Sequence, residues 1–259
     1  MNKFTRLLGL SVVVLSATNT AFAGDAIGPG DNDATWIVGL SAISYDNVYA
    51  GEGRDSVLLP NISYNGETFF VKNGTFNYSL FQAGNYSFGL TGGFDGGFLN
   101  DVSEYRNNAE LVGLEERDST FEGGFYVNHT TDLGRFHFAA LTDLGNKHDG
   151  ESASLTYTFD LKAGNWNINP AVGVHWLSDN KVNHRYGVSL AEANVSRAAY
   201  EAGSAFNVSV GIRARYELTD HWDVNLQTGI NFLDSSISNS SIVDDDNAYH
   251  TAISFNYNF

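Results

Sequence analysis

The second half of this 259-residue chain contains long segments in which apolar and polar residues alternate. In residues 206–217 one face carries Phe206, Val208, Val210, Ile212, Ala214 and Tyr216, and the other carries Asn207, Ser209, Gly211, Arg213, Arg215 and Glu217. Residues 166–176, 222–232 and 248–259 repeat the pattern. A period of two residues is typical of β-strands with one apolar and one polar face. Soluble strands usually hold about five or six residues, whereas a tilted strand needs about 9–11 to cross a membrane.

Aromatic residues sharpen this interpretation, because pairs spaced ten residues apart recur on one face of four strands. The pairs are Trp166 and Trp176, Phe206 and Tyr216, Trp222 and Phe232, and Tyr249 and Phe259. Ten residues of extended chain span about 33 Å. A tilt of about 45° projects this to roughly 23 Å, close to the ~25 Å apolar band between the two aromatic girdles of outer-membrane barrels. The pattern therefore predicts that these eight residues form membrane girdles.

The whole chain can be divided into twelve expected strands, an even number as single-chain bacterial barrels require. They cover residues 34–44, 55–64, 67–73, 75–83, 85–95, 118–130, 134–143, 151–162, 165–177, 204–217, 221–233 and 248–259. Tight turns alternate with longer connections, apart from the short Asn73-Gly74 turn. This order predicts an all-β, transmembrane, antiparallel up-and-down β-barrel of about twelve strands with both termini in the periplasm. The terminal Phe259 is typical of substrates of the barrel assembly machinery.

The first residues predict export. Lys3 and Arg6 precede an apolar run from Leu7 to Leu15, and Ala21-Phe22-Ala23 forms an A-x-A cleavage site. This order is that of a secretory signal peptide. We therefore expect a cleavable signal peptide over residues 1–23, a barrel domain over 24–259, and a location in the outer membrane of a Gram-negative cell, in contact with its lipid.

Composition excludes several classes of function. The formal net charge of −16 disfavours nucleic-acid binding, which requires a basic surface. The absence of cysteine rules out a disulfide framework. No P-loop, nucleophile elbow or zinc-binding helix motif is present, so we expect neither an enzyme nor a cofactor. Asp220-His221 is interpreted as a polar turn. The run from Asp244 to Asp246 could bind a divalent cation, but Ca²⁺ needs about six to eight oxygens, and we interpret it as a solvated loop without metal.

Charged residues on the polar face of the strands would point into the lumen. Arg213, Arg215 and Glu217 are such residues. Buried charges require partners, and the candidates are Glu122, Asp223 and Asp143. The group could form a charged constriction or a structural ion-pair network. About twelve strands do not decide between a filled interior and a channel, and the structural interpretation is preferred.

The loop at 178–203 carries the most specific pattern. Its Ala191–Ala202 part could form a short helix that ends at Gly203, and it could plug the barrel or face a ligand. It contains Tyr186, Gly187, Val188 and Ser189, then Glu192 and Ala193, and later the sequence Tyr200-Glu201-Ala202-Gly203. This loop resembles the signature loop of the MipA/OmpV family (MltA-interacting protein). The segment from Tyr216 to Trp222 resembles the family's penultimate hairpin.

The resemblance implies an outer-membrane barrel without a catalytic motif. It further implies a scaffold that links a lytic transglycosylase to a murein synthase, since the named member of the family is described in this way. Other members are linked to adhesion and host recognition. Three hypotheses follow: a scaffold for cell-wall enzymes, an adhesin or antigen whose extracellular loops bind host matrix proteins, and a small passive pore.

Overall fold

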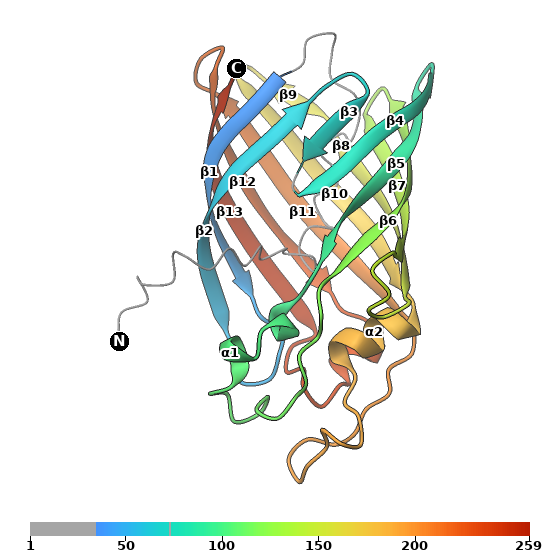
Figure 1. Cartoon of the computed structure of the whole chain (residues 1–259). Coiled ribbons are helices and arrows are strands. Elements are labelled where there is room, and N and C mark those ends of the chain that lie inside the picture. Colours follow the sequence, from blue (N-terminus) through green and yellow to red (C-terminus); the bar gives the residue numbers. More distant parts are fainter. Residues whose placement is uncertain (1–34, 73) are drawn as a thin grey trace.

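A computed structural model describes residues 35–72 and 74–259. The predicted signal peptide over residues 1–23 lies outside the described residues. Strand follows strand around a closed antiparallel ring (Figure 1), because β10 and β11 pair with each other as well as with their other neighbours. The short strands β8 and β9 are separated only by Asp160 and both pair with β10. They therefore occupy one position in the wall, so the ring has twelve positions. The predicted all-β barrel of about twelve strands is confirmed.

The strands lie within a few residues of their predicted positions. They are β1 (Thr35–Asp46), β2 (Arg54–Asn65), β3 (Phe69–Lys72), β4 (Thr75–Ala83), β5 (Tyr86–Asp95), β6 (Thr120–Thr131), β7 (Gly134–Asp143), β8 (Glu151–Phe159), β9 (Leu161–Ala163), β10 (Trp166–Leu177), β11 (Ala205–Glu217), β12 (Trp222–Phe232) and β13 (Asn247–Asn258). Gly84 and Gly164 have positive φ angles of 57° and 60°. These two tight turns therefore use the residue that adopts such a backbone most easily.

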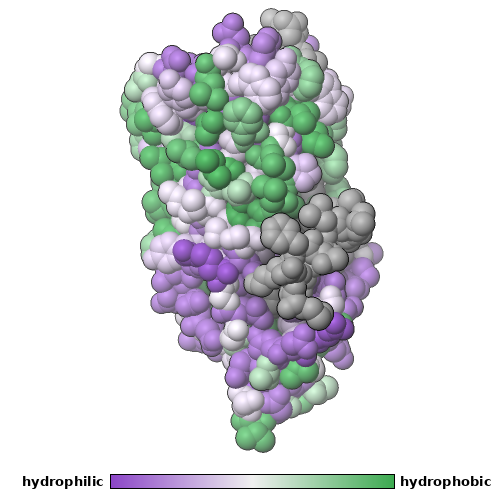
Figure 2. Space-filling view, turned by 90° about the vertical axis from the view of Figure 1, so that its left-hand side faces the viewer, coloured by the Kyte–Doolittle hydropathy of each residue, from purple (hydrophilic) through white to green (hydrophobic). Residues whose placement is uncertain are grey.

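The alternating sequence sorts the side chains between the two faces of the wall. On β11, Val208 is 40% exposed on the outside, whereas its neighbour Ser209 is 1% exposed and faces inward. Apolar side chains gather over the upper half of the barrel in Figure 2, and polar ones cover the lower half. An apolar outer band and a polar interior are the reverse of a soluble barrel and match a wall that contacts lipid.

The predicted girdle residues lie toward the two ends of their strands. Trp166 pairs with Tyr216 near one end, and Trp176 pairs with Phe206 near the other. Most of the eight side chains are exposed, namely Trp166, Phe206, Trp222, Phe232, Tyr249 and Phe259. Their role as membrane girdles stays a prediction.

The two ends of the barrel differ in their connections. Short turns and the C-terminus lie at one end (Figure 1), which we call periplasmic because single-chain barrels keep their short turns there. The helices gather at the other, extracellular end: η3 (Phe98–Asn100), α1 (Val102–Tyr105), α2 (Asp179–Tyr186) and α3 (Ser235–Ser238). None of the helices in residues 35–72 and 74–259 is long and apolar enough to cross a membrane.

The helix expected over residues 191–202 is absent, and the helix of this loop, α2, precedes that segment. Ser178 caps α2 by accepting a hydrogen bond from the Lys181 amide, as serine commonly does at a helix start. Turns replace the expected helix because the Asn194 side chain accepts hydrogen bonds from the amides of Ser196 and Arg197. Asparagine side chains that bond to their own backbone in this way favour turns over helices.

Candidate functional site

The extracellular loops fold onto one another and form a second hydrophobic core outside the wall. We call this part of the molecule the cap; its buried residues come from four loops and include Tyr49, Tyr105, Leu111, Val182, Ile237 and Ile242. A bridge between Tyr49 and Val243 joins two of these loops. Solvated loops bury little apolar surface, so this core indicates a cap of defined structure.

Helix α2 lies across the extracellular mouth of the barrel. On one side, Lys181 and Arg185 contact residues of β5 and β6. On the other side, the Tyr186 ring stacks on Tyr49, with the ring centroids 5.6 Å apart, and the Tyr49 hydroxyl donates to the Arg185 carbonyl at 3.1 Å. Tyr49 follows β1, which stands four positions from β5 and five positions from β6 in the ring of twelve. The helix therefore connects two well-separated parts of the wall.

A buried ionic cluster anchors α2. Lys181 Nζ lies 2.6 and 2.7 Å from the two oxygens of Glu122 and 3.3 Å from Asp95 Oδ2, and Arg185 pairs with the other oxygen of Asp95. Each of these four side chains is at most 10% exposed. Burial lowers the pKa of Lys181, and the Glu122 carboxylate opposes that shift. Such a pair is costly to break, since each charge would lose its partner in a dry site.

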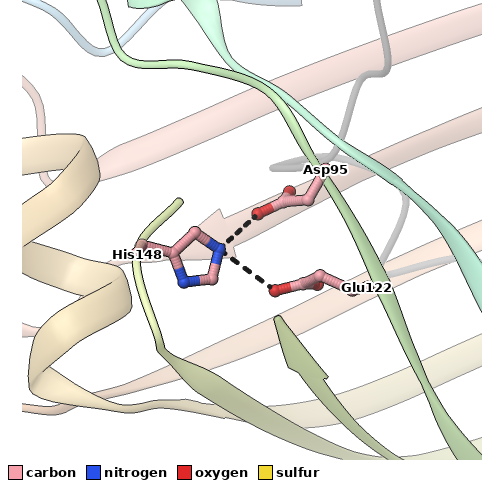
Figure 3. Close-up of side chains that lie close together, drawn as sticks. All are labelled: Asp95, Glu122 and His148. Carbon is pink, nitrogen blue, oxygen red and sulfur yellow. Dashed lines mark ion pairs between the residues drawn. The ribbon is translucent and has the colours of Figure 1, made fainter. Parts of the chain in front are cut away.

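Asp95, Glu122 and His148 also lie close enough together to be considered as metal ligands (Figure 3). His148 Nε2 is 3.5 Å from Glu122 Oε1 and 3.8 Å from Asp95 Oδ2. The Lys181 ammonium already contacts both carboxylates, so a positive charge stands where a metal ion would have to bind. The geometry therefore fits an ionic anchor better than a metal centre.

Asp143 organises the loop that carries His148. Its carboxylate accepts hydrogen bonds from the amides of Gly145, Lys147, His148 and Asp149 at 2.6–3.0 Å. From the sequence, Asp143 and Glu122 are candidate partners of Arg213 and Arg215 in the lumen. Both acids instead hold extracellular structure, because Glu122 lies near the start of β6 and Asp143 ends β7, and both positions are at the extracellular end of the barrel.

The predicted lumen charges on β11 lie near the periplasmic end. Arg215 Nη2 is 3.0 Å from Asp223 Oδ2 on the neighbouring strand β12. The Arg213 guanidinium lies 3.5 Å from Asn169 Oδ1, and Glu217 accepts a hydrogen bond from Asn167 at 3.1 Å. The structure thus brings Arg215 and Asp223 together and separates Glu122 from them. Lys72 on β3 and Arg135 on β7 also face the lumen, and the sequence analysis did not single them out. Both lie on the inward face of their strands, and the alternation of side chains could have identified this orientation.

The family model described as MltA-interacting protein MipA matches residues 38–259 of the chain. The chain belongs to this family. It is therefore an outer-membrane barrel protein, and the resemblance inferred from the loop at 178–203 is confirmed.

Several relatives of this MipA-family chain are known by name. The putative outer membrane protein YiaT of Escherichia coli K12 is 27% identical, covering 80% of this chain and 84% of that protein. Outer membrane protein Omp26La of Vibrio anguillarum is 24% identical, with 95% and 96% covered. The MltA-interacting protein of E. coli K12 is 20% identical, with 92% of each chain covered.

Solved barrels resemble the chain more distantly. A Pseudomonas aeruginosa FadL homologue aligns with a TM-score of 0.41 and 11% identity over 87% of this chain and 89% of that one. OmpT of Vibrio cholerae gives a TM-score of 0.41 and 9% identity, with 87% and 97% covered.

In this MipA-family barrel, the loop at 178–203 connects two parts of the cap. The Glu192 carboxylate accepts hydrogen bonds from the amides of Ser189 and Glu115 and from Arg117. Burial raises the pKa of Glu192, but these donors outweigh that effect and hold the pKa below its usual range. Tyr186, Gly187, Val188, Ser189 and Ala193 lie beside it in the loop, with Tyr186 and Val188 in the cap core and Ala193 packed against it.

Arg197 is the second connection of this loop and was not singled out from the sequence. It is buried, and its guanidinium donates to the carbonyls of Glu192, Glu110 and Val112 at 2.7–3.3 Å. These bonds join the loop at 178–203 to the loop at 96–119. A buried arginine that satisfies main-chain carbonyls fixes two segments at once.

Proposed function

We propose that this protein is a non-catalytic scaffold in the outer membrane, which binds a lytic transglycosylase and a murein synthase through its periplasmic face. The observation that carries the proposal is family membership over residues 38–259. It is supported by a relative with the printed name MltA-interacting protein, which aligns along 92% of the chain. The barrel keeps its partner in place without reacting with it.

The geometry of the extracellular end favours the scaffold hypothesis rather than the passive-pore hypothesis. Helix α2 connects two well-separated parts of the barrel wall, and buried ion pairs to Asp95 and Glu122 hold it there. A diffusion channel needs an open path on both sides. The periplasmic turns offer a small contact surface in which Leu133 and Leu218 are exposed.

Site-specific crosslinking in cells tests the scaffold. A photo-crosslinking residue at Leu133 or Leu218 should capture a lytic transglycosylase or a murein synthase, while the same residue at the extracellular Leu190 should not. Capture of the same proteins from all three positions would indicate non-specific contact. Capture of assembly machinery alone from the periplasmic positions would contradict the proposal.

Surface recognition is a second candidate, favoured by one observation. Leu190 and Val195 are almost fully exposed on the loop that Glu192 and Arg197 hold in place. Exposed aliphatic side chains on a rigid projection suit binding to a protein surface, such as a host matrix protein. Replacing both residues with serine should weaken binding of whole cells to immobilised matrix proteins, and unchanged binding would exclude this role.

A further inference from the structure

The ring of strands is closed only narrowly between β2 and β3. β2 pairs with β1 along all twelve of its residues, but it pairs with β3 only at Tyr64 and Asn65. In Figure 1, β3 lies in the periplasmic half of the barrel, whereas β2 continues to the extracellular end. Among the described residues, no strand and no main-chain hydrogen bond joins residues 54–63 of β2 on the side facing β3. This stretch of β2 is therefore a free edge.

Other segments border the free edge at its two ends. On the periplasmic side, β3 and β4 form a short hairpin. On the extracellular side, Asn108 donates hydrogen bonds to the Ala50 carbonyl and to the Glu52 carboxylate at 2.7–2.8 Å. These bonds join the loop at 96–119 to the loop between β1 and β2. The free edge thus lies between these two borders and opens sideways through the wall.

The outer face of β2 lies against lipid. Leu58 and Ile62 point outward and are 62% and 56% exposed, as expected for the apolar band of an outer-membrane barrel. Main-chain N–H and C=O groups that face hydrocarbon without a hydrogen-bonding partner are strongly unfavourable, and open sheet edges are tolerated at this depth only beside protein or a water-filled space. The free edge therefore needs a polar partner, although it borders the lipid phase.

The inner face of β2 carries an apolar patch beside the free edge. Asn61 faces the lumen, because its side chain donates to Asn256 of β13 at 2.9 Å. Val57 and Leu59 alternate with outward residues and share this inner face, where both are half-buried. Val57 pairs with the half-buried Ile43 of β1. Aliphatic side chains thus stand on both sides of the free edge, some facing the lipid and others facing the lumen.

The chemistry of the edge favours a lipid over a protein strand as its occupant. A strand would add to the edge through regular main-chain hydrogen bonds, but Pro60 has no N–H, and natural sheets use proline to prevent such pairing. Phospholipid already contacts the outer face of β2, and its ester oxygens accept hydrogen bonds. We propose that the free edge of β2 is a lateral opening that binds a membrane phospholipid, whose ester region contacts the edge and whose acyl chain covers Val57 and Leu59 in the lumen.

Photo-crosslinking in vesicles tests the opening. The barrel is refolded in phosphatidylcholine vesicles with one benzophenone residue at Leu59, and mass spectrometry of the intact protein detects lipid adducts. The same residue at Leu58 is the positive control, because this position faces the lipid directly. Ser154 is the matched negative control, since it is half-buried on the inner face of β8, opposite β2 in the ring, where both neighbouring strands are paired. We expect phosphatidylcholine adducts at Leu58 and Leu59 and none at Ser154.

Three results would overturn the opening. Adducts at Leu58 alone would show that the wall is closed to lipid, and equal adducts at Leu59 and Ser154 would show that lipid enters the lumen without using the edge. An adduct at Leu59 with the mass of a second chain would show that the edge pairs with another barrel. Should the Leu59 variant fail to refold, judged from its gel mobility before and after heating, the benzophenone residue at Val57 gives the decision by the same criteria.

Discussion

The two ends of the lumen contain the same kinds of charged residue but use them differently. At the extracellular end, Lys181 and Arg185 belong to a helix, and they are buried only because that helix lies across the mouth. At the periplasmic end, Arg135 and Arg215 belong to the wall itself and stay partly exposed. The charges of α2 hold a separate segment against the wall, whereas the charges of β7 and β11 are part of the wall and leave space in the lumen beside them. The first cluster is an anchor and the second is a lining.

The largest effect is expected from removing the cation of the anchor. Lys181→Met leaves Glu122 buried without its main partner, which costs about 3–5 kcal/mol for such pairs. We expect α2 and the neighbouring cap to open, seen as faster hydrogen exchange of the α2 amides. Lys147→Met is the control, because Lys147 and Asp118 form an exposed pair that should contribute little. Unchanged exchange in Lys181→Met would contradict the anchor.

A smaller, local effect is expected from Arg197→Ala. The substitution leaves the buried carbonyl of Glu192 and the part-buried carbonyls of Glu110 and Val112 without this donor, and an unsatisfied buried group costs about 1–3 kcal/mol. The loop at 189–199 should become sensitive to protease while the barrel keeps its unfolding temperature. Arg197→Lys should restore only part of the protection. Equal loss of protection in the barrel strands would show that the cap and wall are one cooperative unit.

The cap should also loosen in acid because of Glu192. Its folded-state pKa is lowered, so the ionised form stabilises the folded loop above the unfolded pKa of about 4.3. That contribution is lost progressively as the pH falls through the folded pKa. Protease sensitivity of residues 189–199 should therefore rise below about pH 4, and Glu192→Gln should remove this part of the pH dependence. A loop equally protected at every pH would refute this role.

The smallest effect is expected from the acidic run at 244–246. Asp244 accepts a hydrogen bond from the Gly51 amide at 2.9 Å, which gives it a structural partner without a metal ion. Asp244→Asn keeps an acceptor and should change stability by less than about 0.5 kcal/mol. Millimolar CaCl₂ should leave the unfolding midpoint of both proteins unchanged, and a calcium-dependent rise in the unmodified protein would restore the metal interpretation.

The wall could be predicted from the sequence because alternation is local. In each strand, neighbouring residues alone show which face is apolar and which is polar. On β11, the apolar Val208 next to the polar Ser209 is enough to predict which face points outward. The cap could not be predicted in the same way. Glu122 and Lys181 are 59 residues apart, and their contact depends on where a loop folds back. Glu122 lies near the extracellular start of β6, and this height along the barrel, which alternation does not report, separates it from Arg213 and Arg215.

Helix α2 is expected to close the lumen on the extracellular side while the periplasmic side stays accessible. The chain contains no cysteine, so introduced thiols can be labelled individually in proteoliposomes by a membrane-impermeant reagent added outside. Leu190→Cys measures the fraction of molecules with the extracellular end outward, and Leu133→Cys measures the remainder. Gln227 faces the lumen, and we predict that Gln227→Cys is labelled to the same extent as Leu133→Cys. Two results would contradict this closure. One is labelling of Gln227→Cys in barrels of both orientations, and the other is labelling of Gln227→Cys to the same extent as Leu190→Cys.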